Sequence, residues 1–401
     1  MRFCMVTTFY PPYHFGGDAL YVRALCRELV KRGHTVEVVH CIDAYLLGSR
    51  GEMPPDSVEP RVLTHPLRSA WGPLSPLLTH QTGDPALKRR ALRRILSKGF
   101  DVVHFHNISL IGGPAVLTMS QAPVTLYTLH EHWLLCPTHV FWKNRSKPCD
   151  TPTCLSCSIR SGIPPQWWRY TDLVRQSLRA VDALLAPSAY TARRHREAGC
   201  EASIQVLPLF SALEVTDARP PQSPRPQFLF VGRVTLIKGI RLLVETFAGL
   251  PDYDLVVVGD GDLRKPLAAE FAEHKNIQFL GAKSQAELIS RYRAATALIF
   301  PSLVPETFGL GVVEAFACRT PVLVRDAGGA RELVEATGGG LVFRTGDELK
   351  RAVHRLAADP ILREGLAKRA RRGFLRLYTP RRHLDRYLAL VQAILAVKRA
   401  A

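Results

Sequence analysis

The chain has 401 residues, more than one ordinary hydrophobic core requires, so two domains are expected. With 47% hydrophobic and 22% charged residues it has the composition of a globular protein, and no apolar run approaches the roughly 20 residues that cross a bilayer. The net charge of +18 favours an anionic partner, such as nucleotide phosphates, an anionic membrane surface or nucleic acid.

Two features of the sequence bear on the cellular location of the protein and on the class of its anionic partner. Residues 1–12 lack the charged and then apolar pattern of a signal peptide, so we expect a cytoplasmic protein. No recognised nucleic-acid-binding motif accompanies the basic charge, so nucleic acid is not the expected partner.

Apolar four-residue runs alternate with helical patterns, which predicts an α/β protein with parallel sheets. In the first half the expected strands are 3–6, 36–39, 102–105, 124–127 and 183–186. After the first of these come Gly16 and Gly17 and then a helix over about 18–32. Glycines there let the backbone approach a phosphate at the helix N-terminus, although they also suit a tight turn.

Residues 87–96 predict an amphipathic helix with five cationic side chains. Such a helix could dock on the anionic inner face of a membrane. It could equally pack through Leu92 and Ile95 and leave its arginines in water. The sequence leaves both interpretations open.

The strand-like run ending at His130 is followed by a polar segment with four of the nine cysteines: Cys136, Cys149, Cys154 and Cys157. Four thiolates could hold a structural zinc ion, and we favour this interpretation. The spacing also resembles part of an iron–sulfur pattern, and free thiols or disulfides are further alternatives. We expect this insertion, about 133–165, to shape the acceptor side of a binding cleft.

A linker is expected over 216–227, because four prolines there exclude regular structure. A second α/β series follows, with strands expected at 228–231, 255–258, 277–280, 297–300 and 321–324. Arg233 and Lys238 come directly after the first of these strands. A forked guanidinium and a point-charge ammonium there can neutralise a diphosphate leaving group.

Asp260 and Asp262 form an Asp-x-Asp that could hold a divalent metal. We favour a simple turn, because Gly259 and Gly261 are turn residues and because Arg233 and Lys238 already supply the positive charge that a metal would bring. No metal is therefore expected in catalysis.

Residues 305–322 read P-E-T-F-G-L-G-V-V-E-A-F-A-C-R-T-P-V. Glu306 precedes Glu314 by eight residues, and a turn between them leads into an expected helix. The segment follows the strand expected at 297–300. Backbone N–H groups at Phe308, Gly309 and Leu310 would be free to bind an anionic or hydroxyl-rich ligand. Two glutamates at this spacing alone would more often be an exposed helix face.

This segment resembles the Glu-x7-Glu motif of retaining glycosyltransferases of the GT-B fold, specifically family 4, the glycogen-synthase-like and mannosyltransferase-like group. The resemblance covers nearly the whole chain and is strongest over 228–342. It implies two Rossmann-like domains facing across a cleft, 1–215 and 228–380, joined by the linker. A C-terminal helix over 381–401 would pack back on the first domain.

The resemblance also implies roles for individual residues. Arg233 and Lys238 would clamp the diphosphate, Glu306 would face the transferred sugar, and His130 would lie near that sugar. The residues implied for donor binding are Gly16, Gly17, Gly232, Gly259, Gly261, Ala282, Thr307, Phe308, Gly309, Leu310 and Glu314. Two positions depart from the family: Asp18 stands where small residues are frequent, and Arg319 where glycine is usual.

We therefore expect a retaining glycosyltransferase of the hexosyl type that uses a nucleotide diphosphate sugar and needs no cofactor for catalysis. The acceptor would be a saccharide, a lipid-linked molecule or a small molecule, in glycan, glycolipid or surface polysaccharide synthesis. The alternative is a catalytically silent protein that binds nucleotide sugars.

Overall fold

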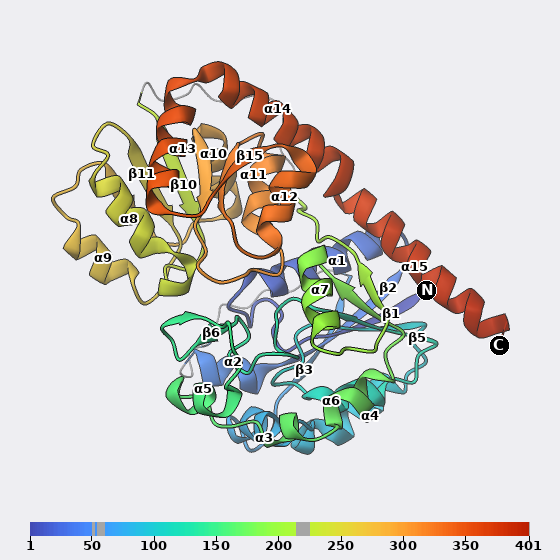
Figure 1. Cartoon of the computed structure of the whole chain (residues 1–401). Coiled ribbons are helices and arrows are strands. Elements are labelled where there is room, and N and C mark those ends of the chain that lie inside the picture. The colour runs from blue at the N-terminus through green and yellow to red at the C-terminus, as the bar shows by residue number, and fades with distance from the viewer. Residues whose placement is uncertain (50–52, 54–60, 214–224, 401) are drawn as a thin grey trace. The chain divides into compact units, whose positions relative to one another are not determined.

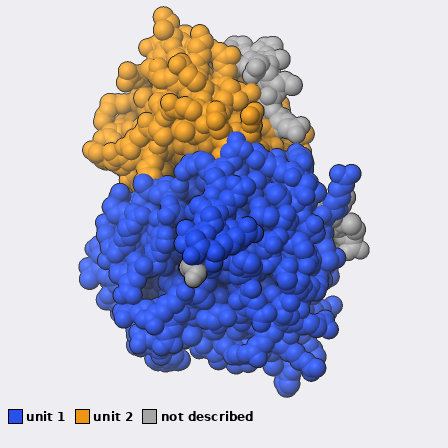
Figure 2. Space-filling model, turned by 90° about the vertical axis from the view of Figure 1, so that its right-hand side faces the viewer, with its two compact units in different colours: residues 1–208, 383–401 blue, residues 209–382 orange. Residues whose placement is uncertain are grey.

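The computed structural model describes residues 1–49, 53, 61–213 and 225–400. The chain forms two compact units, unit 1 with residues 1–208 and 383–401, and unit 2 with residues 209–382 (Figure 2). Most of the expected linker, residues 216–224, lies outside the described residues, and Gln227 already belongs to a strand.

Unit 1 contains a seven-stranded parallel sheet in the order β3-β2-β1-β4-β5-β8-β9 (Figure 1). Its central strands are buried and mostly apolar, as expected for a parallel sheet covered on both faces. The strands are β1 (Arg2–Val6), β2 (Thr35–Cys41), β3 (Leu63–Leu67), β4 (Val102–Phe105), β5 (Val124–Thr128), β8 (Ala183–Ala186) and β9 (Ile204–Val206).

The helices of unit 1 are short, apart from the first and last. They are α1 (Gly17–Lys31), α2 (Ile42–Gly48), α3 (Leu74–Thr82), α4 (Arg89–Leu96), α5 (Cys154–Arg160), α6 (Leu173–Leu178), α7 (Ala189–Glu197) and α15 (Pro380–Ala400), with a 3₁₀ turn η3 (Trp167–Tyr170). The antiparallel hairpin β6 (Trp142–Lys143) and β7 (Lys147–Pro148) belongs to the cysteine-containing insertion.

From His383 onward, α15 is part of unit 1. His383 Nε2 lies 2.9 Å from the Tyr21 hydroxyl on α1, and the Tyr387 hydroxyl lies 3.0 Å from His104 Nδ1 on β4. These buried contacts join the end of the chain to elements formed by its first 105 residues.

Unit 2 contains a six-stranded parallel sheet in the order β12-β11-β10-β13-β14-β15 (Figure 1). Its strands are β10 (Gln227–Val231), β11 (Asp254–Val258), β12 (Ile277–Phe279), β13 (Ala297–Phe300), β14 (Val322–Arg325) and β15 (Gly340–Phe343). Its helices are α8 (Ile240–Ala248), α9 (Arg264–Glu270), α10 (Gln285–Ala294), α11 (Leu310–Ala317), α12 (Gly329–Thr337), α13 (Gly346–Ala358) and α14 (Pro360–Leu377), and a 3₁₀ turn η4 (Leu236–Lys238) precedes α8.

The predicted parallel α/β architecture with two Rossmann-like domains is confirmed, and every expected strand is present. The prediction missed β3, β9 and β15, which lie at edges of the two sheets. β9 has only three residues and β3 carries Pro66, so neither has the continuous apolar run of a central strand. β15 begins with Gly340, and of its residues only Phe343 is buried.

The basic segment 87–96 was only partly predicted. Its first turn is a 3₁₀ helix, and α4 begins at Arg89. Lys88, one of the five cationic side chains of this segment, is buried, and its Nζ donates to the hydroxyls of Ser75 and Thr79, each at 2.9 Å. The side chains of Leu92 and Ile95 belong to the core of unit 1. The apolar face of α4 is therefore not available to a membrane.

Among the described residues, no helix combines the length and the apolar character that crossing a membrane requires.

Candidate functional site

Three glycines bring the loops after β10 and β11 of unit 2 together. Gly232 N–H donates to the Val258 carbonyl oxygen at 3.0 Å, and a Cβ on Gly259 would lie 1.9 Å from the Gly232 oxygen. A Cβ on Gly261 would lie 2.5 Å from the Val234 oxygen. These glycines are thus required for close backbone packing at the carboxyl edge of the sheet, where ligands of open parallel sheets bind.

The third loop at this edge follows β12 and contains Ala282. Gly281, the residue before it, accepts a hydrogen bond from Gly259 N–H at 2.9 Å. Gly232, Gly259 and Gly261, three of the glycines predicted to bind a donor, therefore lie with Ala282 on adjacent loops.

Lys238 and Glu306 form an ion pair in unit 2. Lys238 ends η4 and precedes Gly239, which has φ 73° and approaches Pro301 so closely that a Cβ would lie 2.0 Å from the Pro301 oxygen. This contact places η4 beside the loop after β13. Lys238 Nζ donates to Glu306 Oε1 at 2.6 Å, and Ser302 Oγ donates to the same oxygen at 2.7 Å.

The pKa of Glu306 reflects opposing effects. Burial raises it, but the charge and hydrogen bond of Lys238, the Ser302 hydroxyl and the charge of Arg233 together lower it below the ordinary value. Glu306 is therefore a carboxylate at neutral pH. Arg233, Lys238 and Glu306 lie near one another. Each was given a role from the sequence, but neither this proximity nor the part of Ser302 was predicted.

Glu314 has a different environment. It lies one turn inside α11, and its Oε2 accepts a hydrogen bond from the buried Tyr292 hydroxyl at 2.8 Å. Burial raises the pKa of Glu314, and the Tyr292 hydrogen bond only partly opposes this effect. The two glutamates of the motif are thus electrostatically distinct.

The turn between these glutamates contains Thr307, Phe308 and Gly309. Gly309 precedes α11 with φ 128°, and Leu310 is the first helical residue. The Phe308 side chain is buried and contacts the Tyr378 ring edge to face, with centres 6.0 Å apart. Any contact of Phe308 with a ligand would therefore come from its backbone.

In unit 1, Gly16 and Gly17 lie where the loop after β1 meets α1. A Cβ on Gly16 would lie 2.8 Å from Asp18 Oδ1, so this carboxylate covers the glycine. Asp18 Oδ2 also accepts a long hydrogen bond of 3.5 Å from Asn107 Nδ2. Asp18 thus brings negative charge to the helix N-terminus that was predicted to bind phosphate.

His130 follows β5 and lies against a buried histidine, His106. Its Nε2 lies 2.9 Å from His106 Nδ1, and the two rings stack with centres 5.2 Å apart. Burial lowers the pKa of His130, whereas the charges of Asp18 and Glu131 raise it. His106 was not predicted, although the pattern His104-Phe105-His106 at the end of β4 was a signal for it.

The four clustered cysteines are free thiols in the insertion of unit 1. Burial and the charges of the other three raise the pKa of Cys149. Asn144 N–H donates to Cys157 Sγ at 3.3 Å. Yet within the described part of the chain no group of three or more His, Cys, Asp or Glu side chains is arranged to hold a metal ion. Zinc binding stays a prediction.

Asp260 and Arg319, which the sequence analysis also singled out, both interact with neighbouring residues of unit 2. Asp260 Oδ1 accepts hydrogen bonds from Arg264 Nε at 3.0 Å and from Gly261 N–H at 2.8 Å, in a turn. Arg319 has φ 59°, which explains why glycine is common at this helix end, and its guanidinium pairs with Glu364 on α14.

Comparisons with known proteins cover both units. Residues 15–210 match the model of "Glycosyltransferase Family 4", and residues 215–373 match that of "Glycosyl transferases group 1". An uncharacterized glycosyltransferase of Methanocaldococcus jannaschii is 23% identical over 94% of this chain and 95% of its own. A D-inositol 3-phosphate glycosyltransferase of Streptomyces bingchenggensis is 36% identical, over 37% of this chain and 35% of its own.

Solved structures show the same fold. Sucrose-phosphate synthase from Thermosynechococcus elongatus aligns with a TM-score of 0.76 and 21% identity, over 99% of both chains. Anabaena HepE in complex with UDP aligns with a TM-score of 0.65 and 17% identity, over 98% of this chain and all of HepE. The chain belongs to the family 4 glycosyltransferases of the GT-B fold.

Proposed function

We propose that this glycosyltransferase is a retaining enzyme that moves a hexosyl group from a nucleotide diphosphate sugar to an acceptor hydroxyl. The observation that carries the proposal is the Lys238–Glu306 ion pair, with the charge of Arg233 nearby, at the carboxyl edge of the unit 2 sheet. HepE structures with UDP, and with UDP and glucose, support a nucleotide sugar as the donor.

In this mechanism the positive charges act on the leaving group. Lys238 uses one of its three N–H donors on Glu306, so two remain for phosphate oxygens. As the bond between the anomeric carbon and the diphosphate oxygen breaks, Lys238 and Arg233 stabilise the growing negative charge. The acceptor oxygen attacks from the same face, and its proton passes to the departing phosphate oxygen. No metal is required in this proposal.

The remaining site residues bind and orient the donor. We assign the transferred sugar to Glu306 and the ribose to Glu314, which the Tyr292 hydroxyl holds in place. The first-turn amides of α11 and the packed glycine loops would provide backbone contacts. The placement of His130 near the donor sugar stays a prediction from the family resemblance, as do the saccharide, lipid-linked or small-molecule acceptors.

The test is turnover with a panel of nucleotide diphosphate sugars. Arg233→Ala and Lys238→Ala should each reduce turnover by about 10²–10³-fold, because each removes one preorganised charge. Arg241→Ala is the matched control, since Arg241 pairs with Glu270 on the surface of the same unit. Near-normal turnover in both site variants would reject the proposed clamp.

The anomeric configuration of the product, read by proton NMR, tests retention separately. A product with the donor's configuration supports the same-face mechanism, and an inverted product contradicts it. Binding of nucleotide sugars without transfer or hydrolysis would instead identify a silent binding protein.

A further inference from the structure

A pocket of about 680 Å³ lies within unit 1 and is formed by η3, α6, α7 and neighbouring loops. Its volume suits a small organic molecule. The apolar side chains of Leu134, Val174 and Leu178 line it, and Ala198 lines it at the end of α7. None of the donor-site residues discussed above is among its lining residues.

Arg169 gives this pocket a partly buried positive charge. Its guanidinium lies over the rings of Trp133 and Trp168, 5.4 and 4.5 Å from their centres. It donates to the backbone oxygens of Trp133 at 2.6 Å and Leu134 at 3.2 Å, and to the side-chain oxygen of Gln166. All of these hydrogen-bond acceptors are neutral.

The positive charge of Arg169 is therefore not balanced by a carboxylate. Across the described residues, no Asp or Glu side chain forms an ion pair with Arg169, and two of its five N–H donors remain unused. A partly desolvated cation without an anion is costly, and a bound anion would offset that cost.

His195 provides a second polar group in the same wall. Its Nδ1 lies 2.8 Å from the Thr191 carbonyl oxygen, which can only accept, so Nδ1 donates. Nε2 is then the acceptor nitrogen of the neutral ring, and it is buried without a partner within the described chain. Because this atom is buried, His195 adds a neutral ring to the pocket lining and not a ligand contact.

We propose that this pocket binds a small amphipathic anion, whose carboxylate or phosphate group pairs with Arg169 while its apolar body packs against Leu134, Val174 and Leu178. Cys154, at the start of α5, also lines the pocket. The cysteine-containing insertion thereby contributes to a ligand site of unit 1.

Calorimetric titration of the full chain tests the proposal with four probes: octanoate, octyl phosphate, 1-octanol and inorganic phosphate. The two amphipathic anions should bind at least tenfold more tightly than either the neutral alcohol or inorganic phosphate. Equal binding of 1-octanol would overturn the role of the anion, and equal binding of inorganic phosphate would overturn that of the apolar body. Absence of binding by both amphipathic anions would overturn the site.

Substitutions in the pocket test whether the amphipathic anions bind there. Arg169→Met keeps an apolar stem and removes the charge, so affinity for both anions should fall at least tenfold, whereas Arg160→Met, at the end of α5, should leave it unchanged. Because Arg169→Met also removes hydrogen bonds to the backbone, Ala198→Trp provides a second route that fills the pocket and leaves Arg169 intact. Unchanged affinity in both pocket variants would contradict the proposal.

Discussion

At the residue scale, Glu306 and Glu314 lie in opposite electrostatic surroundings although they belong to one motif. Glu306 is held by a lysine and a serine hydroxyl, and its pKa is lowered. Glu314 is held by a neutral phenol, and burial raises its pKa. Replacing each glutamate by glutamine should therefore have different consequences.

Glu306→Gln should reduce turnover by about 10²-fold, because it removes the charge that holds Lys238, and should change the affinity for free nucleotide diphosphate little. Glu314→Gln should weaken binding of the nucleotide diphosphate about tenfold, a free-energy loss near 1.4 kcal/mol, because ribose is present with or without the sugar. Calorimetry with the free nucleotide diphosphate and turnover measurements separate the two effects.

Tyr292→Phe provides a matched change, since it removes only the hydroxyl that holds Glu314, and it should partly reproduce Glu314→Gln. If both glutamine variants bind and turn over like the parent protein, the two glutamates are only part of a helix face.

His106 should act as a positioning residue for His130. His106→Leu removes the 2.9 Å contact and should lower kcat about tenfold or more, as misplaced groups do. His106→Asn places an amide nitrogen where Nδ1 was and should restore much of kcat. Stopped-flow or steady-state kinetics measure both, and equal loss in the two variants would indicate a purely structural role.

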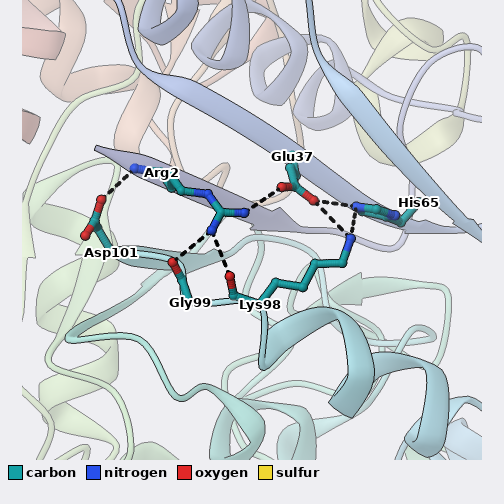
Figure 3. Close-up of polar contacts among 6 residues, drawn as sticks. All are labelled: Arg2, Glu37, His65, Lys98, Gly99 and Asp101. Carbon is teal, nitrogen blue, oxygen red and sulfur yellow. Dashed lines mark hydrogen bonds and ion pairs between the residues drawn. The ribbon is translucent and has the colours of Figure 1, made fainter.

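At the element scale, a polar network joins β1, β2, β3 and the segment before β4 (Figure 3). Glu37 on β2 accepts from Arg2 at 3.2 Å and contacts His65 Nε2 at 2.7 Å, with Lys98 at 3.5 Å. Arg2 N–H also donates to Asp101 at 2.7 Å. The network consists of side chains from four separate segments, so it links neighbouring strands.

The network predicts a pH-dependent contribution to stability. Burial raises the pKa of Glu37, but His65, Lys98 and Arg2 outweigh it, and the net pKa is lowered. The stabilisation is therefore complete above the unfolded-state value of about 4.3 and is lost as pH falls through the lower folded-state value. Glu37→Gln should reduce the free energy of unfolding at pH 7 by about 1–3 kcal/mol.

Urea unfolding followed by circular dichroism from pH 7 to pH 3 measures this difference. The gap between parent and Glu37→Gln should shrink below pH 4.3 or so. Glu335→Gln, which breaks an exposed pair with Arg331, should cost no more than about 1 kcal/mol. A gap for Glu37→Gln that is constant over this pH range would contradict the assignment.

The cysteine-containing insertion is a second element with a testable property. Its hairpin turns through Asn144 and Arg145, both with positive φ, and Asn144 N–H reaches Cys157 Sγ. If the four thiols hold structural zinc, the purified protein should contain about one zinc per chain, and Cys154→Ser should lose it and be less stable. Elemental analysis that finds neither zinc nor iron would exclude the site, and non-reducing mass spectrometry would then test for disulfides.

At the scale of the whole molecule, the net charge of +18 favours an anionic surface as a partner. The basic helix α4, however, has its apolar face buried in the core of unit 1. Any attraction of this helix to a membrane must therefore come from its exposed arginines. Each contributes about 1 kcal/mol near an anionic surface, and salt screens the effect.

Vesicle co-sedimentation tests this property. The protein should bind phosphatidylserine-containing vesicles at low salt, and the triple change Arg90→Glu, Arg93→Glu, Arg94→Glu should weaken binding and lower its salt sensitivity. Vesicles of neutral lipid are the control. Binding that is unaffected by both salt and these substitutions would remove α4 from the contact.

The central strands followed from the sequence alone, because buried parallel strands require continuous apolar runs. The candidate donor-site residues came from the family resemblance, and their binding roles stay predictions. Only the tertiary structure identified the partners of these residues. Tyr292 lies 22 residues from Glu314, His106 lies 24 from His130, and Lys238 lies 68 from Glu306. Such hydrogen bonds depend on how strands and loops pack in three dimensions, and no local pattern specifies that packing.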